Sequence, residues 1–443
     1  MDYAEALAFW YARVNFEVRA ARPGDLKLER MRALLRALGD PHGRVRLVHV
    51  TGTKGKGSTA AMLAAALRAA GYRVGLFTSP HLTHVEERIQ VDGVPIRRAE
   101  LAARMSEVAP VVRAMDADAL PPPTFFEIGT ALGFLHFCRR RCDVAVIEVG
   151  LGGRFDSTNV CRPLVAVVTS VGFDHTAQLG PTLAAIAFQK AGIIKRGVPV
   201  VSGVTEPGPR EVIRAAAAGQ GARLIECGTD FRFDYRPGDP PTVAVTTAGR
   251  RYPPLALALL GAHQGHNAAL AVAAAECLRA TGMSVPDAAL ARGFATVTWP
   301  ARVEVVGTRP AVILDMAHNV PSAVALVATL RQAFPAARHK AVVFAVSADK
   351  QYADILAVLA GYFDHVHLTK YGINPRCVPP ETLAAVLAAT APGTPATVHP
   401  TSAAAWAAAR AAAGPDDLVC VTGSVFLAGE LRPTLMGTPP LSR

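Results

Sequence analysis

Short uninterrupted runs of apolar residues alternate along the chain with longer runs in which apolar residues recur at helical spacing. A short continuous apolar run is typical of a parallel strand that is buried on both faces of a sheet. Before residue 202, strands are predicted over residues 45–50, 73–77, 144–149, 165–169 and 198–201. Helices are predicted between them over residues 58–70, 98–115, 125–139 and 182–191. This alternation predicts a doubly wound, mostly parallel α/β sheet.

Two stretches depart from the alternation. Residues 1–44 predict a helical lead-in, because apolar residues recur at helical spacing from Leu26 to Leu38. Residues 228–260 contain short β-like pieces that Pro, Gly and Asp separate, over 231–235, 243–246 and 250–252. These pieces predict antiparallel hairpins at a sheet edge, and a helix over 264–281 is predicted to follow them.

A second alternating series begins after Pro300. Its predicted strands are 311–314, 341–346, 365–369, 396–399 and 418–422, and its predicted helices are 322–334, 352–362, 380–389 and 402–413. A chain of 443 residues is too long for one ordinary core. We therefore expect an N-terminal domain over residues 1–298 and a smaller, Rossmann-like α/β domain over residues 299–443.

Composition narrows the class of protein. The formal net charge is +11, but Arg is scattered and no basic run is interleaved with aromatic residues, so a nucleic-acid partner is not expected. A basic surface attracts anionic small molecules such as ATP. The seven cysteines form no C-x-x-C pair, which indicates reduced thiols in a cytoplasmic protein. Residues 1–22 contain no cleavable apolar core, and no apolar run of about 18 residues follows, so neither a leader segment nor a membrane partner is expected. The expected oligomeric state is a monomer.

Residues 50–59, VTGTKGKGST, carry the strongest chemical signal. A Gly-rich turn between a strand and a helix N-terminus directs backbone N–H groups and the helix dipole to one point, and Lys56 adds a full positive charge. This is a polyphosphate site of the P-loop type, although Val50 and Gly57 stand where a standard loop has Gly and Ser or Thr. An ordinary Gly-rich turn explains the glycines but not the two lysines. The missing hydroxyl leaves open which side chain holds Mg²⁺.

Polar clusters follow several of the predicted strands, where open α/β sheets bind ligands. They are TSPH at 78–81, EVGLGGRFDSTN at 148–159 and DH at 174–175. Glu148 and His175 are donor types that bind a divalent ion near phosphates, and Lys190 follows in an apolar setting. The alternatives are a capped surface carboxylate for Glu148, a buried and satisfied ring for His175, and a lysine whose stem merely packs on apolar neighbours for Lys190.

The second series repeats this arrangement. LDMAHN at 314–319 ends a predicted strand and precedes a helix, and TGS at 422–424 ends the last predicted strand in the same way. Asp315, His318 and Ser424 are candidates for ligand contact. Turn formation and helix capping are the alternative, since Asp, Asn, Ser and Thr routinely provide both.

Taken in order, these motifs resemble those of the folylpolyglutamate synthase/dihydrofolate synthase branch of the Mur ligase family. The matching segments are GTKGKGST (52–59), TSPHL (78–82), ERI (87–89), TFFE (124–127), EVGLGGRFDSTN (148–159), DH (174–175), LGPTLAAIAFQKAGIIK (179–195), HQGHNAALA (263–271), ARVEVV (301–306), LDMAHN (314–319) and TGS (422–424). They span most of the chain in the order of the family.

The resemblance implies an ATP- and Mg²⁺-dependent ligase with two metal ions. A substrate carboxylate attacks the γ-phosphate of ATP, and the amine of L-glutamate then displaces phosphate from the acyl phosphate. The acceptor is dihydropteroate, the γ-carboxylate of a reduced folate, or both. Positive groups at the phosphates neutralise the charge that develops during the transfer.

The resemblance also implies roles for individual residues. The catalytic residues are Lys56, Lys190 and His318. ATP is bound by Thr53, Lys54, Gly55, Lys56, Gly57, Ser58, Asn267, Arg302 and Asp315. The metal ligands are Ser79, Glu148, His175 and Lys190, the last as a carbamate. The pterin, folate or glutamate is bound by Thr124, Phe125, Phe126, Glu127, Phe155 and Ser424.

Three positions depart from the family pattern. Lys54 stands where Asn is usual, Gln189 where an acidic residue often precedes the carbamylated lysine, and Met316 where Gly is usual. Two other functions remain open. One is a Mur-type ligase that uses a different carboxylate acceptor, and the other is a P-loop nucleotide-binding module without ligase chemistry.

Overall fold

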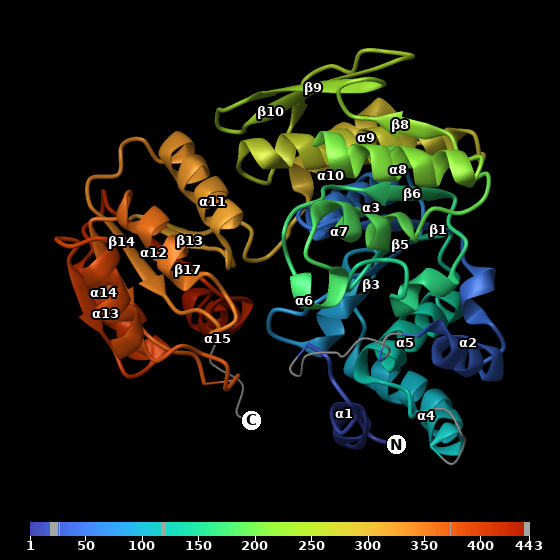
Figure 1. Ribbon diagram of the computed structural model, residues 1–443, viewed down its shortest axis with the longest axis horizontal. Helices are drawn as coiled ribbons and strands as arrows, with labels where there is room; N and C mark the ends of the chain where they lie inside the picture. The colour runs from blue at the N-terminus through green and yellow to red at the C-terminus, as the bar shows by residue number, and fades with distance from the viewer. Residues whose placement is uncertain (18–24, 26, 117–120, 373, 438–443) are drawn as a thin grey trace. The chain divides into compact units, whose positions relative to one another are not determined.

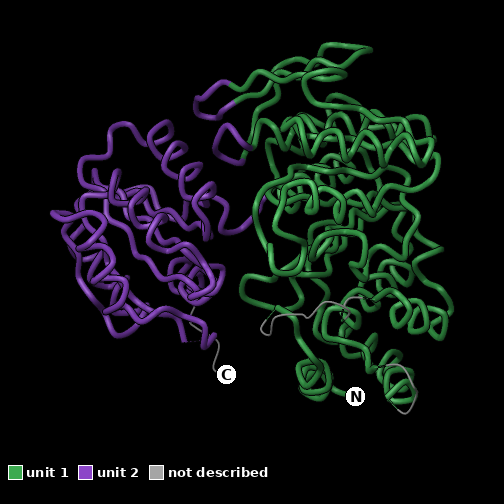
Figure 2. The backbone as a smooth tube through the Cα atoms, in the orientation of Figure 1, with its two compact units in different colours: residues 1–235, 242–258, 264–297 green, residues 236–241, 259–263, 298–443 purple. Residues whose placement is uncertain are grey.

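The computed structural model (Figure 1) describes residues 1–17, 25, 27–116, 121–372 and 374–437. The chain divides into two compact units, which Figure 2 distinguishes by colour. Unit 1 comprises residues 1–235, 242–258 and 264–297. Unit 2 comprises residues 236–241, 259–263 and 298–443.

Unit 1 contains an eight-stranded sheet in the order β4-β3-β2-β5-β1-β6-β7-β8. Its strands are β1 Leu47–Thr51, β2 Val74–Phe77, β3 Ile89–Val91, β4 Val94–Pro95, β5 Val144–Glu148, β6 Val165–Val168, β7 Val200–Ser202 and β8 Leu224–Glu226. Neighbouring strands in the run β2-β5-β1-β6-β7-β8 pair in parallel. β3 pairs with β2 and with β4 in the antiparallel sense. The predicted mostly parallel sheet is therefore confirmed, and the edge pair β3 and β4 is an element that the sequence pattern did not reveal.

Helices cover both faces of this sheet, and Figure 1 shows α8 and α9 on the side of the strands opposite to α2, α4 and α5. The helices are α1 Tyr3–Tyr11, α2 Leu28–Ala37, α3 Lys56–Ala69, α4 Arg98–Met115, α5 Phe125–Arg139, α6 Thr176–Leu179, α7 Leu183–Ala191, α8 Pro207–Gly219, α9 Ala262–Arg279 and α10 Asp287–Thr296, with short 3-10 turns at Pro41–Arg44, Val85–Arg88 and Ser157–Val160. One apolar cluster joins α1, α2, α4 and α5 to the sheet, and another joins α7 and α8 to β6 and β7. The sheet is thus doubly wound.

Within its described residues, the predicted helical lead-in over residues 1–44 contains the helices α1 and α2 and the 3-10 turn Pro41–Arg44. Trp10 at the end of α1 is fully buried and donates its indole N–H to the carbonyl oxygen of Phe125 at 2.8 Å, which ties α1 to α5. α2 then begins at Leu28. Leu26, with which the predicted helical spacing starts, lies outside the described residues.

The predicted hairpins form a separate three-stranded sheet rather than the edge of the main one. Its strands, β9 Phe231–Arg236, β10 Thr242–Thr247 and β11 Leu255–Ala256, follow the order β11-β10-β9. The strand predicted at 250–252 is wrong, because there only Arg251 forms an isolated bridge, to Thr246. Pro253 and Pro254 follow, and neither has an N–H group with which to continue a ladder.

Unit 2 contains a six-stranded sheet in the order β12-β13-β17-β14-β15-β16. Its strands are β12 Glu304–Thr308, β13 Ala311–Leu314, β14 Lys340–Phe344, β15 His365–Leu368, β16 Ala396–Val398 and β17 Leu418–Thr422, and its helices are α11 Val320–Ala333, α12 Tyr352–Ala360, α13 Pro380–Thr390, α14 Ser402–Ala412 and α15 Val425–Leu435. All pairs are parallel except β12 with β13. This agrees with the predicted Rossmann-like α/β architecture.

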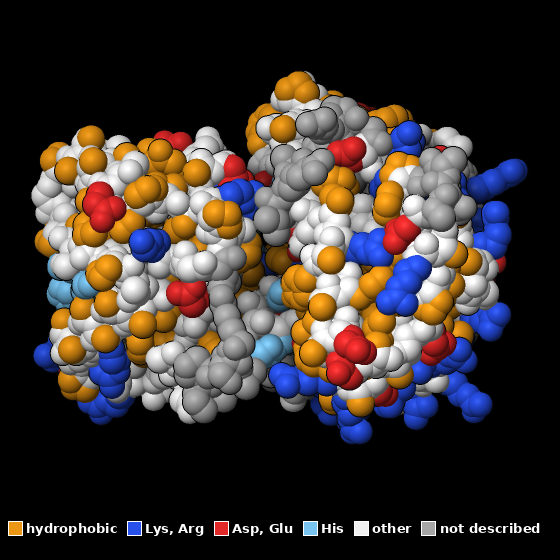
Figure 3. Space-filling view, turned by 90° about the horizontal axis from the view of Figure 1, so that it is seen from below, with side chains coloured by type: hydrophobic (Ala, Val, Ile, Leu, Met, Phe, Trp, Pro, Cys, Tyr) orange, Lys and Arg blue, Asp and Glu red, His pale blue; other side chains and the backbone are white. Residues whose placement is uncertain are grey.

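On the face that Figure 3 draws, Lys and Arg side chains recur along the right-hand and lower edge, and elsewhere they are interspersed with acidic and hydrophobic ones. Within the described ranges, no helix has the length and apolar character required to cross a membrane.

Candidate functional site

The phosphate loop connects β1 to α3, whose helix starts at Lys56. Gly55 precedes the helix with a φ of 84°, a left-handed conformation that favours glycine. A Cβ at Gly55 would collide with Oδ1 of Asn267, a residue of α9. Asn267 is buried, and its amide donates to Oε1 of Gln264 at 2.9 Å. The structure therefore brings the predicted nucleotide residue Asn267 directly against the loop.

The loop is also held by the segment that follows β6. The backbone N–H of Thr53 donates to the carbonyl oxygen of Ser170 at 2.9 Å, and that of Lys54 donates to Oγ of Ser170 at 2.9 Å. The hydroxyl of Thr53 lies 3.1 Å from the carbonyl oxygen of Gly172 and 3.0 Å from its nitrogen. Thr53 is thus engaged with the protein on several sides, and residues 53–54 and 170–172 form one hydrogen-bonded unit.

Ser79 and Glu148 meet at the ends of two neighbouring strands. β2 and β5 pair in parallel, so the residues that follow them lie at the same edge of the sheet. The backbone N–H of Ser79 donates to Oε2 of Glu148 at 3.3 Å. Glu148 is 5% exposed, and a carboxylate that is so little exposed needs hydrogen bonds or a cation.

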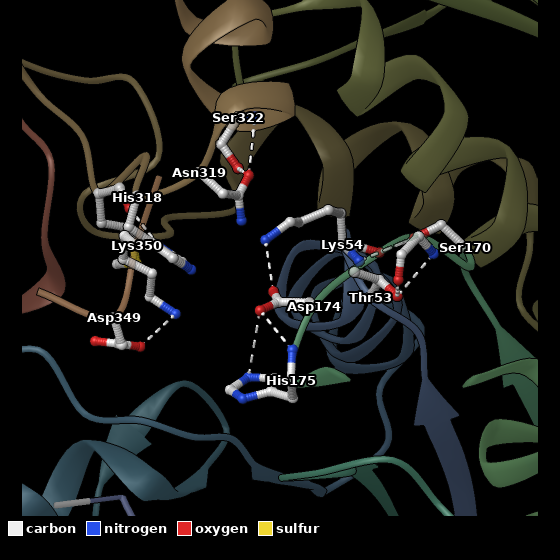
Figure 4. A network of polar contacts seen from close by, with 12 residues as sticks. Thr53, Lys54, Ser170, Asp174, His175, His318, Asn319, Ser322, Asp349 and Lys350 are labelled. Atoms are coloured by element: carbon white, nitrogen blue, oxygen red, sulfur yellow. Dashed lines mark hydrogen bonds and ion pairs between the residues drawn. The ribbon is translucent and has the colours of Figure 1, made fainter. Parts of the chain in front are cut away.

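Asp174 and His175 stand immediately before α6, and Figure 4 shows Asp174 between Lys54 of the phosphate loop and His175. Nζ of Lys54 lies 3.1 Å from Oδ2 of Asp174. Oδ1 of the same carboxylate accepts the backbone N–H of His175 at 3.1 Å and lies 3.7 Å from its Nε2. His175 has a φ of 50°, a left-handed conformation that is uncommon among residues other than glycine.

Lys190 lies near the end of α7 and is only 3% exposed. Burial is the main cause that lowers its pKa to about 7, and the positive charges of Lys56 and Lys54 lower it further, while Asp174 opposes the shift. The end of α7 packs on the loop after β5, where the N–H of Arg154 donates to the carbonyl oxygen of Gln189 at 2.7 Å. Lys190 therefore shares an electrostatic environment with the phosphate loop.

The candidate metal ligands are of mixed type. Within the described part of the chain, no group of three or more His, Cys, Asp or Glu side chains is arranged to hold a metal ion. Ser79 adjoins Glu148 and His175 adjoins Asp174, while Ser58 is buried in the first turn of α3. Mg²⁺ is often bound through one or two carboxylates, with water and substrate phosphate oxygens as its other ligands.

The TFFE segment begins α5, and most of its side chains already have structural partners. Thr124 and Glu127 form a capping box, in which the N–H of Thr124 donates to Oε2 of Glu127 at 2.8 Å. Nε of Arg30 lies 3.1 Å from both oxygens of Glu127. Phe125 is buried and stacks on Trp10 with ring centroids 4.9 Å apart. The predicted contact of Thr124, Phe125 and Glu127 with a substrate stays a prediction.

Phe126 and Phe155 have surface available. Phe126 is half-buried and packs so closely on Gly150 that a Cβ there would lie 2.5 Å from its ring. Phe155 follows Arg154 in the Gly-rich segment and is 47% exposed. An exposed aromatic ring beside a polar strand end is a suitable surface for a flat heterocycle.

Unit 2 has its own cluster at the ends of β13 and β17. Asp315 is buried and accepts the N–H groups of Ala317 at 2.7 Å and Val303 at 3.0 Å, and the hydroxyl of Thr422 lies 3.4 Å away. Burial raises the pKa of Asp315, and the positive charge of Arg302 opposes that shift. Arg302 and Asp315, two predicted nucleotide residues, therefore lie close together.

His318 and Ser424 stand at the same ends of strands. Nδ1 of His318 lies 2.9 Å from the carbonyl oxygen of Met316. Oγ of Ser424 accepts the N–H of Phe426 at 3.1 Å and so caps α15. The capping alternative is thus realised for Ser424.

Sequence reasoning missed two residues of this region. Asp174 has no role in the site that the motifs predict, although its position next to the predicted metal ligand His175 is a usable signal. Nothing in the sequence marks Ser170, which carries the contacts between the phosphate loop and the segment after β6.

Comparison with known proteins agrees with this architecture. Residues 50–275 match the Mur ligase middle domain, and residues 301–425 match the Mur ligase glutamate ligase domain. The dihydrofolate synthase/folylpolyglutamate synthase of Bacillus subtilis (strain 168) is 39% identical over 374 residues, which cover 83% of this chain and 85% of that protein. The folylpolyglutamate synthase of Lacticaseibacillus casei is 36% identical and covers 99% of both chains.

Solved structures of relatives have the same fold. Mycobacterium tuberculosis folylpolyglutamate synthase complexed with ADP has a TM-score of 0.89 at 34% identity, with 99% of each chain covered. E. coli FolC in complex with DHPP and ADP has a TM-score of 0.85 at 32% identity, with 99% of this chain and 98% of that chain covered. The chain therefore belongs to the folylpolyglutamate synthase/dihydrofolate synthase branch of the Mur ligase family.

Proposed function

We propose that the chain is an ATP-dependent ligase that joins L-glutamate to a folate-type carboxylate, using Mg²⁺. The observation that carries this proposal is the phosphate loop at the start of α3. Lys56 of this loop lies near the buried Lys190, and its positive charge lowers the pKa of Lys190. Relatives of matching length are named for this activity, and the E. coli structure holds DHPP and ADP. The acceptor is dihydropteroate, the γ-carboxylate of a reduced folate, or both.

The reaction has two steps. The acceptor carboxylate attacks the γ-phosphorus of ATP, its oxygen forms the new bond to phosphorus, and ADP leaves. The amine of glutamate then attacks the acyl carbon, phosphate leaves, and the amine loses a proton as the amide forms. Lys56 and the N–H groups at the start of α3 bind the phosphate oxygens and stabilise the negative charge of the first transition state.

The donor set fits Mg²⁺. Glu148 supplies a buried carboxylate, and Ser79, whose N–H it accepts, supplies a hydroxyl beside it. His175 and a carbamate on Lys190 complete the set that we propose for two ions. Mg²⁺ prefers oxygen ligands and keeps phosphate oxygens and water in its shell, so an incomplete protein cage suits it. When bound, it neutralises charge on the phosphate oxygens.

Carbamylation of Lys190 is the part of this proposal that burial and charge support best. An ammonium ion that is 3% exposed and close to Lys56 and Lys54 is unfavourable, and its pKa of about 7 leaves much of the amine neutral. A neutral amine attacks CO₂, a C–N bond forms, and one proton is released. The product is an anion with two oxygen donors, which replaces the cation by a metal ligand.

The remaining residues bind the organic parts of the substrates. We propose that Asn267, Arg302 and Asp315 bind ATP. Asn267 lies beside the phosphate loop, and Asp315 follows the end of β13 with Arg302 near it. Phe126 and Phe155 form part of the pterin surface. His318 and Ser424 serve the glutamate or the acyl phosphate.

We further propose that the chain works as a monomer in the cytoplasm and that its domains are 1–298 and 299–443. All seven cysteines are free thiols, as expected in a reducing compartment. Light scattering of the purified protein at micromolar concentration tests the oligomeric state.

Product analysis tests the function. The full chain is incubated with ATP, Mg²⁺ and L-glutamate, with dihydropteroate in one reaction and tetrahydrofolate in another. Mass spectrometry should show the addition of one glutamyl group to one acceptor or both, with one ADP per amide. Omission of glutamate should abolish the product. No addition to either acceptor would contradict the proposal, and ADP release with a peptidoglycan precursor instead would favour the other Mur-type ligases.

A further inference from the structure

Lys54 is the residue of the phosphate loop that the resemblance leaves unexplained. Its ammonium group lies 3.1 Å from Oδ2 of Asp174, and the two side chains are 36% and 16% exposed. The pair is therefore partly shielded from water, where an ion pair is worth more than on the open surface.

The other oxygen of the same carboxylate holds His175. Oδ1 of Asp174 accepts the backbone N–H of His175 at 3.1 Å and lies 3.7 Å from Nε2 of the ring. His175 has a φ of 50°, and a left-handed conformation costs a non-glycine residue about 1–2 kcal/mol. Such a conformation persists only where neighbouring contacts fix it, and Asp174 supplies one of these contacts.

Backbone groups and the hydroxyls of Thr53 and Ser170 join the loop to the beginning of this segment. Thr53 and Lys54 bond to Ser170 and Gly172, which come directly after β6. The side chain of Lys54 extends the connection to Asp174, and the carboxylate extends it to His175. Figure 4 shows Lys54 and His175 on the two sides of Asp174.

We propose that Lys54 is a positioning residue that acts through Asp174 to fix His175, and that it does not act chiefly as a direct ligand of the nucleotide. This inference rests on the proposed function of His175 as a metal ligand. It predicts that Lys54 governs the affinity of the metal in the nucleotide complex, because residues behind a metal ligand orient that ligand. The affinity for nucleotide alone should depend on Lys54 only weakly.

Binding experiments without turnover provide the first test. K54M keeps the length of the side chain and removes its charge, whereas K54R keeps the charge. Calorimetry measures the affinity of each variant for ADP in the presence of EDTA. Electron paramagnetic resonance measures the affinity of the ADP complex for Mn²⁺, a spectroscopic substitute for Mg²⁺. In K54M the Mn²⁺ affinity should fall about tenfold, while the ADP affinity stays within about twofold.

Kinetics provide the second test. In K54M the kcat for glutamate addition should fall and the Mg²⁺ concentration at half-maximal rate should rise, with little change in the KM for ATP. K54R should recover most of the kcat and most of the wild-type Mg²⁺ dependence. The matched control is K340M, which removes the same kind of pair, since Nζ of Lys340 lies 3.0 Å from Oδ2 of Asp364 in unit 2. K340M should leave all of these values unchanged.

Two results overturn the inference. One is an ADP affinity that falls tenfold in K54M, because Lys54 would then bind the phosphates directly. The other is an unchanged Mn²⁺ affinity. A third variant, D174N, should resemble K54M, and the double variant should be no worse than either single one, because both changes break one contact. If the wild-type chain bound ADP and Mn²⁺ but ligated no folate, the proposed function would fail while Lys54 could still be judged from the binding data.

Discussion

Oδ1 of Asn267 occupies the space beside Gly55 that a Cβ at that position would need. The two residues lie far apart in the sequence, one in the phosphate loop and one in α9. Their contact explains why the loop tolerates no side chain at this point, in addition to the left-handed backbone of Gly55.

Gly55→Ala should therefore weaken nucleotide binding by about tenfold or more, because either the loop or Asn267 has to move. Gly71→Ala is a matched control: Gly71 also has a left-handed φ, 95°, but no atom lies within 4 Å of a Cβ there. The control should lose about 1–2 kcal/mol of stability and retain ADP binding. Calorimetry with ADP measures the difference, and equal ADP affinities for the two variants would contradict the steric explanation.

Glu148→Gln should abolish most of the metal-dependent turnover. The amide keeps the size of the side chain but removes the charge, so ADP release should fall about a hundredfold or more and need higher Mg²⁺. ADP binding without metal should persist. Glu107→Gln, which alters a surface carboxylate paired with Arg139, is the control and should behave like the wild type. Full turnover in Glu148→Gln would contradict the proposed role of this carboxylate as a metal ligand.

Lys190→Ala should lose turnover by about a hundredfold while the affinity for ADP changes little, because the side chain is proposed to hold metal rather than nucleotide. In the wild type, removal of CO₂ should lower activity and bicarbonate should restore part of it. Carbon-13 NMR with labelled bicarbonate measures the carbamate directly. Activity that does not respond to bicarbonate, after loss of the carbamate has been verified by NMR, would count against the modification.

The buried pair of Arg30 and Glu127 should matter for stability. Both side chains are almost fully buried, and Nε of Arg30 bonds to both carboxylate oxygens. Arg30→Met leaves the carboxylate uncompensated and should cost about 3–5 kcal/mol of unfolding free energy. The exposed pair of Arg139 and Glu107 is the control, since Arg139→Met should cost less than about 1 kcal/mol. Urea unfolding measures both, and similar losses would show that the ion pair is not the cause.

Because His49 is buried, we expect the folded protein to lose stability in acid. Its ring is fully buried in β1, where Nε2 lies 2.8 Å from Oγ1 of Thr158, and burial lowers its pKa to about 3. An unfolded histidine titrates near 6.5, so between these values the unfolded chain binds a proton that the folded chain does not. Stability therefore falls as the pH is lowered from about 6.5, by about 1.4 kcal/mol per pH unit from this residue.

His49→Gln removes this titration. The variant should be less stable than the wild type at pH 7, and the gap should narrow at pH 5. Urea unfolding at the two values measures the gap, and a gap that does not depend on pH would contradict the assignment to His49.

The sequence predicted the central parts of both sheets, because buried parallel strands appear as short apolar runs. It did not predict α8, α10 or α15. The short strands β3, β4 and β12 escaped prediction because their apolar runs are brief or interrupted by polar residues.

The motifs placed the candidate site at the ends of the strands, and the structure brings Ser79 to Glu148 and Asn267 to the loop. Long-range partners could not be predicted, because no local pattern shows that Lys54 reaches Asp174 or that Arg30 reaches Glu127. Such contacts depend on strand order, which periodicity does not encode.

The hydrogen bonds between the phosphate loop and the segment after β6 have a consequence for biosynthesis. The loop sequence is translated early, but the N–H of Lys54 finds its acceptor in Ser170, 116 residues later. A nascent chain that ends before β6 carries the loop residues without the contacts that shape them. Nucleotide should therefore be unable to help the emerging N-terminal segment fold, and it can act as a folding ligand only after β6 has joined β1.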